Sequence, residues 1–190
     1  MRLLVVSQYF WPENFRVNDL VAGLVSRGHE VTVLTGLPNY PSGRFFHGYS
    51  WRGAWLEDYA GAKVVRVPLL PRGHGGSMRL IFNYLSFVLS GIWGAAFRLH
   101  GPFDVIIVFE TSPITVGIPA AFARWRFQAP ILFWVLDLWP DSLAATGAVR
   151  SPLVLGEVSR LVRWVYRRCA RVLVQSRAFI PEVVRHGVPR

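Results

Sequence analysis

The sequence predicts an α/β protein with a Rossmann-like, doubly wound and mostly parallel sheet. Short runs of apolar and β-branched residues recur along the chain, and helical stretches separate them. Runs that are apolar nearly throughout are typical of strands buried on both faces. Because a strand, a helix and a parallel strand connect almost always in a right-handed sense, repetition of this unit gives a doubly wound sheet. The predicted strands are Arg2–Ser7, Glu30–Gly36, Ala62–Pro68, Asp104–Glu110, Pro130–Asp137 and Arg171–Ser176.

The first predicted helix lies between the first two strands. Asn14 is placed to cap its amino end, and Gly28 is placed to end it. Its apolar residues recur at helical spacing on one face, and they are Val17, Leu20, Val21, Leu24 and Val25. These residues predict one complete βαβ unit.

The stretch 37–61 interrupts the alternation of strands and helices. It mixes Pro, Gly and Asn residues, which are typical of turns, with many aromatic side chains. We interpret it as a loop at the lip of a site that faces a membrane. The residues expected to contact the membrane are Phe45, Phe46, Trp51, Trp55 and Arg79. The alternative is that the rings only pack beneath their own loop, since such a stretch must bury something to stay ordered.

The segment Leu80–Phe97 carries no charged residue and is bounded by Arg79 and Arg98. Its length is at the lower limit for a membrane span. Against a span, the flanking strands would then lie in different compartments, which a single sheet does not allow. A narrow stripe of polar or small residues also runs along one side of it, formed by Asn83, Ser86, Ser90 and Gly94. We therefore predict a buried or interfacial helix, whose functional form is a helix docked on a membrane surface.

The composition combines a formal net charge of +10 with 52% hydrophobic residues in a chain of 190 residues. This length fits one domain of ordinary size. Basic charge together with high apolarity favours an anionic membrane as the partner. Nucleic acid is not expected, because the chain has no zinc-finger spacing, no RNP-type aromatic motif and no basic segment followed by heptads. The single cysteine, Cys169, and the short first apolar run predict a cytoplasmic location, peripheral to the inner face of the membrane.

In an open α/β sheet, ligands bind outside the carboxyl ends of the strands. The first of these turns, QYFWPENF, contains no glycine, so it lacks the close backbone approach that a dinucleotide pyrophosphate needs. A phosphate-binding GxxxxGK[ST] loop and a GxSxG nucleophile motif are also absent from the sequence. The five histidines show no ligand spacing, and no metal site or bound cofactor is expected.

Four acidic residues are candidates for chemistry. Glu110 and Asp137 follow the wholly apolar runs VIIVF and ILFWVL, so we expect both at a desolvated rim where reactivity can be tuned. Glu13 precedes the first helix, where it either functions or serves only as a capping carboxylate. Asp141 follows Trp139–Pro140 and is expected to start a helix.

A row of arginines is predicted on one side of the helix that starts near Ser151–Pro152. Its members are Arg160, Arg163, Arg167 and Arg171, opposite Val158, Leu161, Val162 and Val165. Such a row is usually a solvated face, and the alternative is contact with phospholipid.

Several segments, taken in order, resemble the N-terminal domain of family 4 glycosyltransferases, in particular the WbuB-like subgroup of polysaccharide assembly. They include TGLPNYPSG, RVPLLPRG, FNYLSFVLSG, SPITVGIPA, WVLDLWPDSL and VLVQS, and together they cover essentially the whole chain. The resemblance implies the N-terminal half of a GT-B fold. It also implies a retaining, metal-independent enzyme that transfers a sugar from a nucleotide donor, UDP-linked, to a polyprenyl-diphosphate-linked acceptor in bacterial surface polysaccharide synthesis.

In this family the N-terminal domain holds the acceptor, and the C-terminal domain holds most of the donor. The resemblance thus implies that residues 1–190 form the acceptor-binding domain and that the donor-binding domain lies outside this chain. By the same resemblance, the catalytic residues are Asp137 and Glu110. The acceptor-binding residues are Glu13, Asn14, Arg16, Asn39, Tyr40, Thr111 and Ser112. Leu136 stands where many relatives have a histidine.

Two functions are compatible with these observations. The first is the acceptor-binding half of a glycosyltransferase, inactive as an isolated fragment. The second is a non-catalytic, membrane-docked acceptor-binding subunit whose catalytic partner is a separate chain. A reading frame that continues into a second βαβ series distinguishes the first from the second. The identity of the donor and acceptor sugars depends on side-chain placement that sequence does not give.

Overall fold

A computed structural model describes residues 1–53, 55–73 and 76–189 of the chain. The strands are β1 (Arg2–Val6), β2 (Glu30–Gly36), β3 (Leu56–Tyr59), β4 (Ala62–Val67), β5 (Val105–Glu110), β6 (Ile131–Val135) and β7 (Arg171–Val174). The helices are α1 (Arg16–Ser26), α2 (Ser77–Phe97), α3 (Gly117–Phe127), α4 (Asp141–Ala145), α5 (Pro152–Tyr166) and α6 (Ile180–Arg185). Short 3-10 turns cover Ile114–Val116 and Arg177–Phe179.

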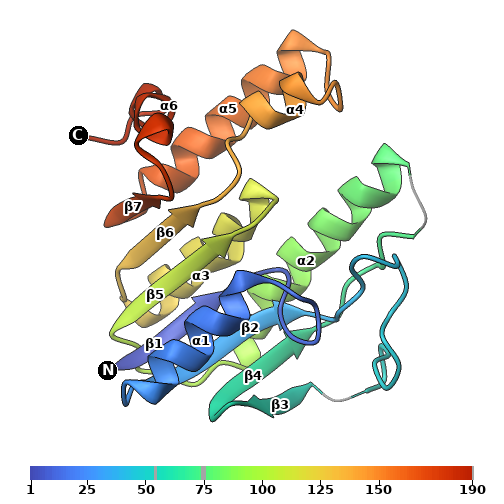
Figure 1. The fold of residues 1–190 in the computed structure, drawn as a ribbon, viewed down its shortest axis with the longest axis vertical. Coiled ribbons are helices and arrows are strands. Elements are labelled where there is room, and N and C mark those ends of the chain that lie inside the picture. Colours follow the sequence, from blue (N-terminus) through green and yellow to red (C-terminus); the bar gives the residue numbers. More distant parts are fainter. Residues whose placement is uncertain (54, 74–75, 190) are drawn as a thin grey trace.

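The strands form one seven-stranded sheet in the order β3-β4-β2-β1-β5-β6-β7 (Figure 1). All neighbours pair in parallel except β3 and β4. In the register of the central strand, Leu3 lies opposite Val31 on one side and Val105 on the other. The α/β, mostly parallel sheet predicted from sequence is therefore confirmed, and six of the strands lie where they were predicted.

The antiparallel edge strand β3 lies inside the stretch that was predicted to be a loop. It forms a hairpin with β4 through Ala60 and Gly61, both of which have positive φ. Only four residues long, with alternate residues exposed, it pairs on one side alone. Such a strand needs no apolar run, which is why sequence periodicity did not reveal it.

Helix α1 covers one face of the sheet, and α2, α3 and α5 cover the other (Figure 1). Each face has its own apolar core. Helix α1 begins at Arg16, with Phe15 as the capping residue, so the prediction that Asn14 caps it was wrong. No side chain caps the amino end of α1 among the described residues; Asn18 in its first turn instead accepts the Trp11 N–H (3.0 Å) and donates to the Glu13 carbonyl (2.8 Å) of the preceding loop. Gly28, with φ of 79°, ends the helix as predicted.

Helix α2 is long and apolar enough to cross a bilayer by length and composition. Part of the predicted polar and small stripe is buried against the sheet: Asn83 is fully buried, and a Cβ added to Gly94 would clash with Val67. The strands on either side of the helix, β4 and β5, belong to the same sheet. The opposite side of α2 is exposed and apolar along its whole length, and we call it the outer face of α2. Its residues are Met78, Ile81, Phe82, Leu85, Leu89, Trp93 and Phe97.

Two further predictions concern the last third of the chain. Helix α5 ends at Tyr166, so Arg171 is the first residue of β7, and the predicted row of arginines on one helix was wrong at that position. The turn at Arg167–Arg168 separates the two elements. Asp141 begins α4 directly after Pro140, as predicted.

A buried arginine on β4 fixes the start of the loop that follows β1. Arg66 is fully buried and forms an ion pair with Glu57 on β3 (2.9 Å). Its guanidinium also donates to the carbonyl oxygens of Gly36 (3.1 Å) and Trp11. One charged side chain thus holds the edge hairpin, β2 and the first loop in register.

Candidate functional site

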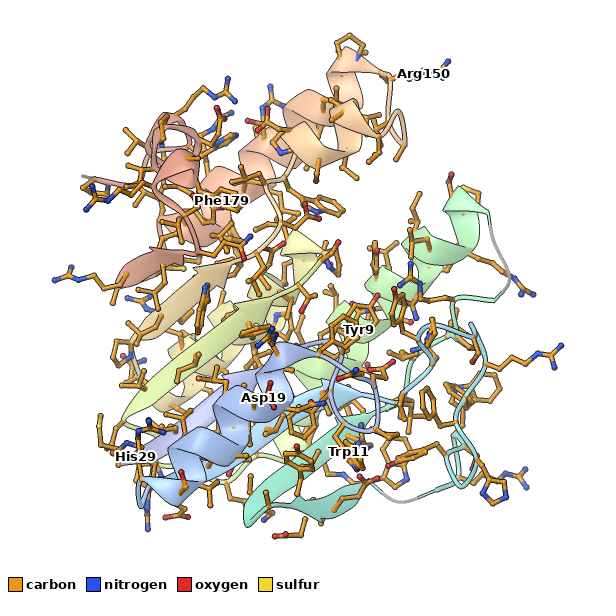
Figure 2. The ribbon with its side chains drawn as sticks, viewed as in Figure 1. Tyr9, Trp11, Asp19, His29, Arg150 and Phe179 are labelled. Carbon is orange, nitrogen blue, oxygen red and sulfur yellow. The ribbon has the colours of Figure 1, made fainter. Side chains whose placement is uncertain are left out.

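The order of the strands reverses at β1, which has β2 on one side and β5 on the other. At such a switch point the loops after the strands diverge and leave a crevice at the carboxyl edge of the sheet. The loops that follow β1, β2, β4, β5 and β6 begin at this edge, and they carry most of the residues singled out in the sequence. Tyr9, which follows β1, lies at this edge on the side of α2 (Figure 2).

Glu13 joins the loop after β1 to the loop after β2. Its side chain is buried, with 2% of its surface exposed. One carboxylate oxygen accepts the N–H groups of Asn39 and Tyr40 (both 2.8 Å), and the other accepts the N–H of Phe10 (3.1 Å). Burial raises the pKa of Glu13 to about 7, although these three N–H groups oppose the shift. Glu13 therefore holds the loops after β1 and β2 together beneath the site.

Asn39 continues the same scaffold toward the loop after β4. It is buried, donates to the Leu37 carbonyl (3.0 Å) and accepts the backbone N–H of Arg72 (3.1 Å). The next residue, Tyr40, is partly exposed, and its ring packs on Phe15 with centroids 5.3 Å apart. Asn39 is thus a positioning residue, and Tyr40 is the residue of this pair that a ligand can reach.

Arg72 is a site residue that the sequence reasoning did not select. Its guanidinium lies over the rings of Tyr40 (5.1 Å) and Tyr9 (5.9 Å), and it donates to the Tyr9 hydroxyl (3.2 Å). Within the described residues, no carboxylate forms an ion pair with it. A cation held by aromatic faces and left without a counter-ion is suited to an anionic ligand.

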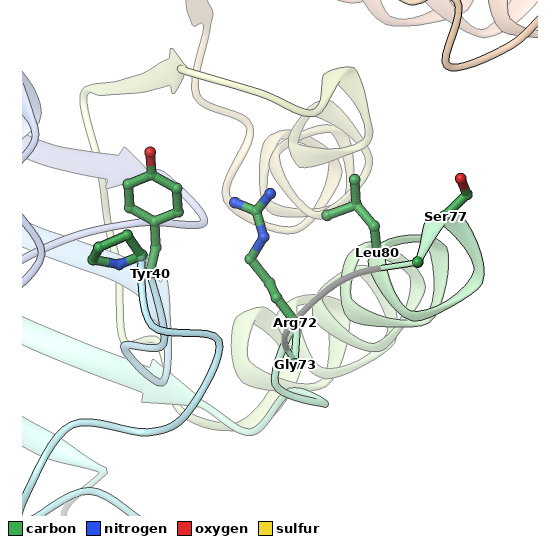
Figure 3. Close-up of a pocket in the computed structure, with 7 residues that line it drawn as sticks. Tyr40, Arg72, Gly73, Ser77 and Leu80 are labelled. Atoms are coloured by element: carbon green, nitrogen blue, oxygen red, sulfur yellow. The ribbon is translucent and has the colours of Figure 1, made fainter.

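Arg72 lines a cavity of about 350 Å³, which we call the Arg72 cavity. In Figure 3 the Arg72 side chain rises between Tyr40 and Leu80. The remaining lining residues are Pro41, Gly73, Gly76 and Ser77. The cavity therefore lies between the loop after β2 and the amino end of α2.

The second half of the site is formed after β5 and β6. Glu110 is fully buried, and one of its oxygens accepts the N–H groups of Leu136 (3.3 Å) and Asp137 (3.2 Å). Its other oxygen has no partner among the described residues. Burial raises the pKa of Glu110 well above its usual value, and the nearby Asp137 carboxylate adds to the shift. Glu110 therefore holds the backbone that carries Asp137.

Asp137 lies at the edge itself and is partly exposed. Its carboxylate accepts the indole N–H of Trp139 (2.9 Å). The Trp139 ring in turn packs edge-on against Tyr84 of α2, with centroids 6.4 Å apart. The carboxylate is thus oriented by an aromatic partner while one side stays accessible.

Tyr84 connects the two halves of the site. Burial raises the pKa of its hydroxyl, which lies near the side chains of Tyr9 and Ser112. Ser112 has a φ of 147°, a conformation rare for a residue with a side chain. Next to it, the Thr111 hydroxyl is buried and has no partner among the residues described. The polar side chains of the site therefore follow the carboxyl edge of the sheet from Arg72 and Tyr40, past Tyr9 and Tyr84, to Asp137.

The structure thus brings together most of the predicted catalytic and acceptor residues at one edge. Asn14 and Arg16 lie on the exposed surface beside this edge. The site residues that sequence reasoning missed are Tyr9, Arg72 and Tyr84. Arg72 had a signal, since it stands in a Pro-Arg-Gly turn after an apolar run, whereas Tyr84 lies in an uncharged helix and had none.

The predicted membrane-contact residues lie elsewhere, beside α2. Phe45 packs edge-on against Trp51 (5.8 Å), and the Trp51 indole donates to the Leu69 carbonyl (2.9 Å). Trp55 packs on Trp93 of α2, with centroids 6.3 Å apart. Trp51 nevertheless keeps 54% of its surface exposed. The rings therefore pack together in part and remain accessible in part.

Comparison with known proteins identifies the kind of domain that carries this site. The glycosyl transferase 4-like domain family matches residues 14–190. A search of curated proteins finds no match. Among solved structures, HepE (Alr3699) from Anabaena, in complex with UDP and glucose, aligns with 100% of this chain at 14% identity and a TM-score of 0.50. CalG4, the calicheamicin glycosyltransferase, aligns with 88% at 14% identity and a TM-score of 0.48. The aligned part is 42% of each of those chains, and the likeness to HepE shows the fold alone.

Proposed function

Because the chain belongs to the glycosyl transferase 4-like domain family, we propose that it is the acceptor-binding half of a GT-B glycosyltransferase of the WbuB-like subgroup. In this proposal the enzyme transfers a sugar from a UDP-linked donor to a polyprenyl-diphosphate-linked acceptor in bacterial surface polysaccharide synthesis. Transfer proceeds with retention of configuration and without a metal ion. A second domain, outside these residues, supplies most of the donor pocket.

The observation that carries the proposal is the family match over residues 14–190, combined with the Arg72 cavity and the polar side chains at the switch point of the sheet. The crevice offers what a lipid-linked sugar requires. Arg72 provides a cation for phosphate, with no carboxylate partner among the described residues. Tyr40 provides a partly exposed aromatic ring beside Arg72 for contact with a sugar, and Asp137 provides a carboxylate held by Trp139.

Asp137 has the role closest to the chemistry in this proposal. Retaining transfer from a nucleotide sugar develops positive charge at the donor carbon as the nucleotide leaves. A carboxylate fixed at the rim of the crevice stabilises that charge or orients the attacking hydroxyl, and its fixed position avoids reorganisation during reaction. Glu110 acts through the backbone of Asp137 as a positioning residue.

A position at the inner face of the membrane completes the proposal. The outer face of α2 exposes large apolar side chains along its length, with Leu89 71% and Phe97 69% exposed. An apolar patch of this kind on a chain of net charge +10 supports docking on an anionic bilayer. The expected contacts of Phe45, Phe46, Trp51, Trp55 and Arg79 belong to the same proposal.

The test is sugar transfer by the complete gene product that contains this chain. Purified protein is incubated with UDP-sugars and a fluorescent short-chain polyprenyl-diphosphate sugar, and mass spectrometry detects a product one sugar heavier. The free acceptor sugar, without its lipid, is the control. We expect transfer to the lipid-linked acceptor only. Binding of the lipid-linked acceptor without transfer from any donor would favour the non-catalytic subunit instead.

A further inference from the structure

A second concavity lies next to the Arg72 cavity. It has a volume of about 790 Å³ and lies between the loop 43–51 and α2. Phe45, Trp51 and Phe82 form much of its wall, and we call it the aromatic groove. The edge-on packing of Phe45 on Trp51 and the hydrogen bond of Trp51 to Leu69 hold its loop side in place. The loop side of the groove is therefore held by aromatic packing and one hydrogen bond.

The groove and the Arg72 cavity share one lining residue, Gly73. The Gly73 N–H donates to the carbonyl of Gly43 (2.9 Å), and a Cβ added to Gly43 would overlap the Gly73 carbonyl. Both glycines have positive φ. The two spaces are therefore neighbours across Gly73, against which the Arg79 side chain also lies.

The charges of the two spaces are of one sign. Arg72 lines the cavity, and Arg44 and Arg79 line the groove. Among the residues described as lining either space, none is acidic. This arrangement is complementary to a ligand with an anionic group at the junction and an apolar chain in the groove.

The groove opens toward the outer face of α2, because Phe82 belongs to both. Its side chain lines the groove and is 50% exposed. An apolar chain that leaves the groove at Phe82 meets Leu85 and Leu89 one and two turns along the same helix. The path therefore runs from a cation, along aromatic rings, to an exposed apolar surface.

We propose that Arg72 binds the diphosphate of the acceptor and that the aromatic groove binds the first isoprenoid units of its lipid. The inference rests on the proposed function and extends it to the residues that recognise the lipid. One groove accommodates one chain, so the occupant is a single-chain polyprenyl diphosphate rather than a two-chain phospholipid. Arg72 and Phe82 are then specificity-determining residues for the acceptor.

The test measures binding of farnesyl diphosphate to the 190-residue chain by isothermal titration. Farnesol, inorganic pyrophosphate and phosphatidylglycerol vesicles are titrated in parallel. The variants are Arg72→Gln and Phe82→Ser. Their matched controls are Arg126→Gln, which also lies over an aromatic ring, and Leu153→Ser, which is also an exposed apolar residue on a helix. Thermal melting confirms that each variant is folded.

We expect farnesyl diphosphate to bind at least tenfold more tightly than either farnesol or pyrophosphate. Arg72→Gln and Phe82→Ser each weaken that binding about tenfold or more, and the two controls do not change it. Equal binding of farnesol, or wild-type affinity in folded Arg72→Gln and Phe82→Ser proteins, would overturn the inference. Vesicle binding that competes with farnesyl diphosphate would assign the groove to phospholipid.

The inference and the proposed function fail in different ways. If the complete enzyme transfers sugar to a lipid-linked acceptor at the parental KM in both variants, the groove assignment is wrong while the function stands. If both variants lose farnesyl diphosphate binding but the enzyme transfers no sugar, the groove assignment stands and the function is wrong.

Discussion

Replacing Asp137 with asparagine tests whether this carboxylate takes part in the reaction. In the folded protein its side chain accepts one hydrogen bond from Trp139, and its backbone N–H binds Glu110. Asparagine keeps a side-chain oxygen that accepts the Trp139 bond and leaves the backbone contact unchanged. The structural loss is therefore below about 1 kcal/mol, which corresponds to a melting temperature within about 2–4 °C of the parent for a protein of this size.

The effect on transfer is expected to be much larger. Removing one preorganised charge contact in a transition state costs about a hundredfold in rate, or roughly 2.7 kcal/mol. The measurement is kcat for sugar transfer by the complete enzyme beside its thermal melt, with Asp19→Asn on the exposed side of α1 as the control. An Asp137→Asn enzyme that keeps most of its activity removes this carboxylate from the chemistry. A large fall in melting temperature would instead show that Asp137 is structural.

Three further predictions concern the 190-residue chain itself. It should co-sediment with phosphatidylglycerol vesicles at low salt and be released at about 1 M salt, where the Debye length falls to roughly 3 Å. Leu89→Glu should weaken this binding, and Leu153→Glu should not. Full recovery of the protein in the supernatant at low salt would contradict the prediction. It should show no saturable binding of UDP in the micromolar range by titration calorimetry, because we assign the donor pocket to another domain, and a tight complex would show that assignment to be wrong. Finally, the pKa of Glu13 rises from 4.5 to about 7 on folding, so between these values the folded state keeps a proton that the unfolded state loses. The contribution of Glu13 to the free energy of unfolding therefore falls by about 3 kcal/mol between pH 4.5 and pH 7. In chemical denaturation over this range, the free energy of unfolding of Glu13→Gln should decrease less with pH than that of the parent, and parallel profiles would contradict the shift.

The sheet was predictable because its signal is local. Each parallel strand is buried on both faces, so its own run of apolar residues indicates a strand, as with Val5 in β1 and Val33 in β2. The edge strand β3 lacks this signal because its stability comes from pairing with β4. The predicted cap of α1 was wrong for a related reason, since the loop before the helix is held by contacts of Asn18 with Trp11 and Glu13 that local sequence does not indicate.

For the site, the sequence predicted only which residues lie at the ends of the strands. The rule that ligands bind at the carboxyl edge placed Glu110 and Asp137 there, but it could not tell which of the two carboxylates reaches the crevice. Burial decides this, because Glu110 is enclosed by the elements around it while Asp137 stays accessible. Arg72 and Tyr84 enter the site from segments far apart in the chain, and only the fold shows that both meet Tyr9.

The register of the central strand determines when the crevice can form during folding. Leu3 in β1 pairs with Val105 in β5, across about a hundred residues of chain, whereas its pairing with β2 closes a much shorter loop. Loop closure of this length is slow, so β1, α1 and β2 can assemble before β5 arrives. The crevice lies at the junction of these two parts, and Ser7 reaches the Phe109 carbonyl only once they have joined (3.3 Å). A chain emerging from the ribosome therefore acquires its crevice only after β5 has been synthesised, and any slowing of β5 docking delays ligand binding more than it delays the first βαβ unit.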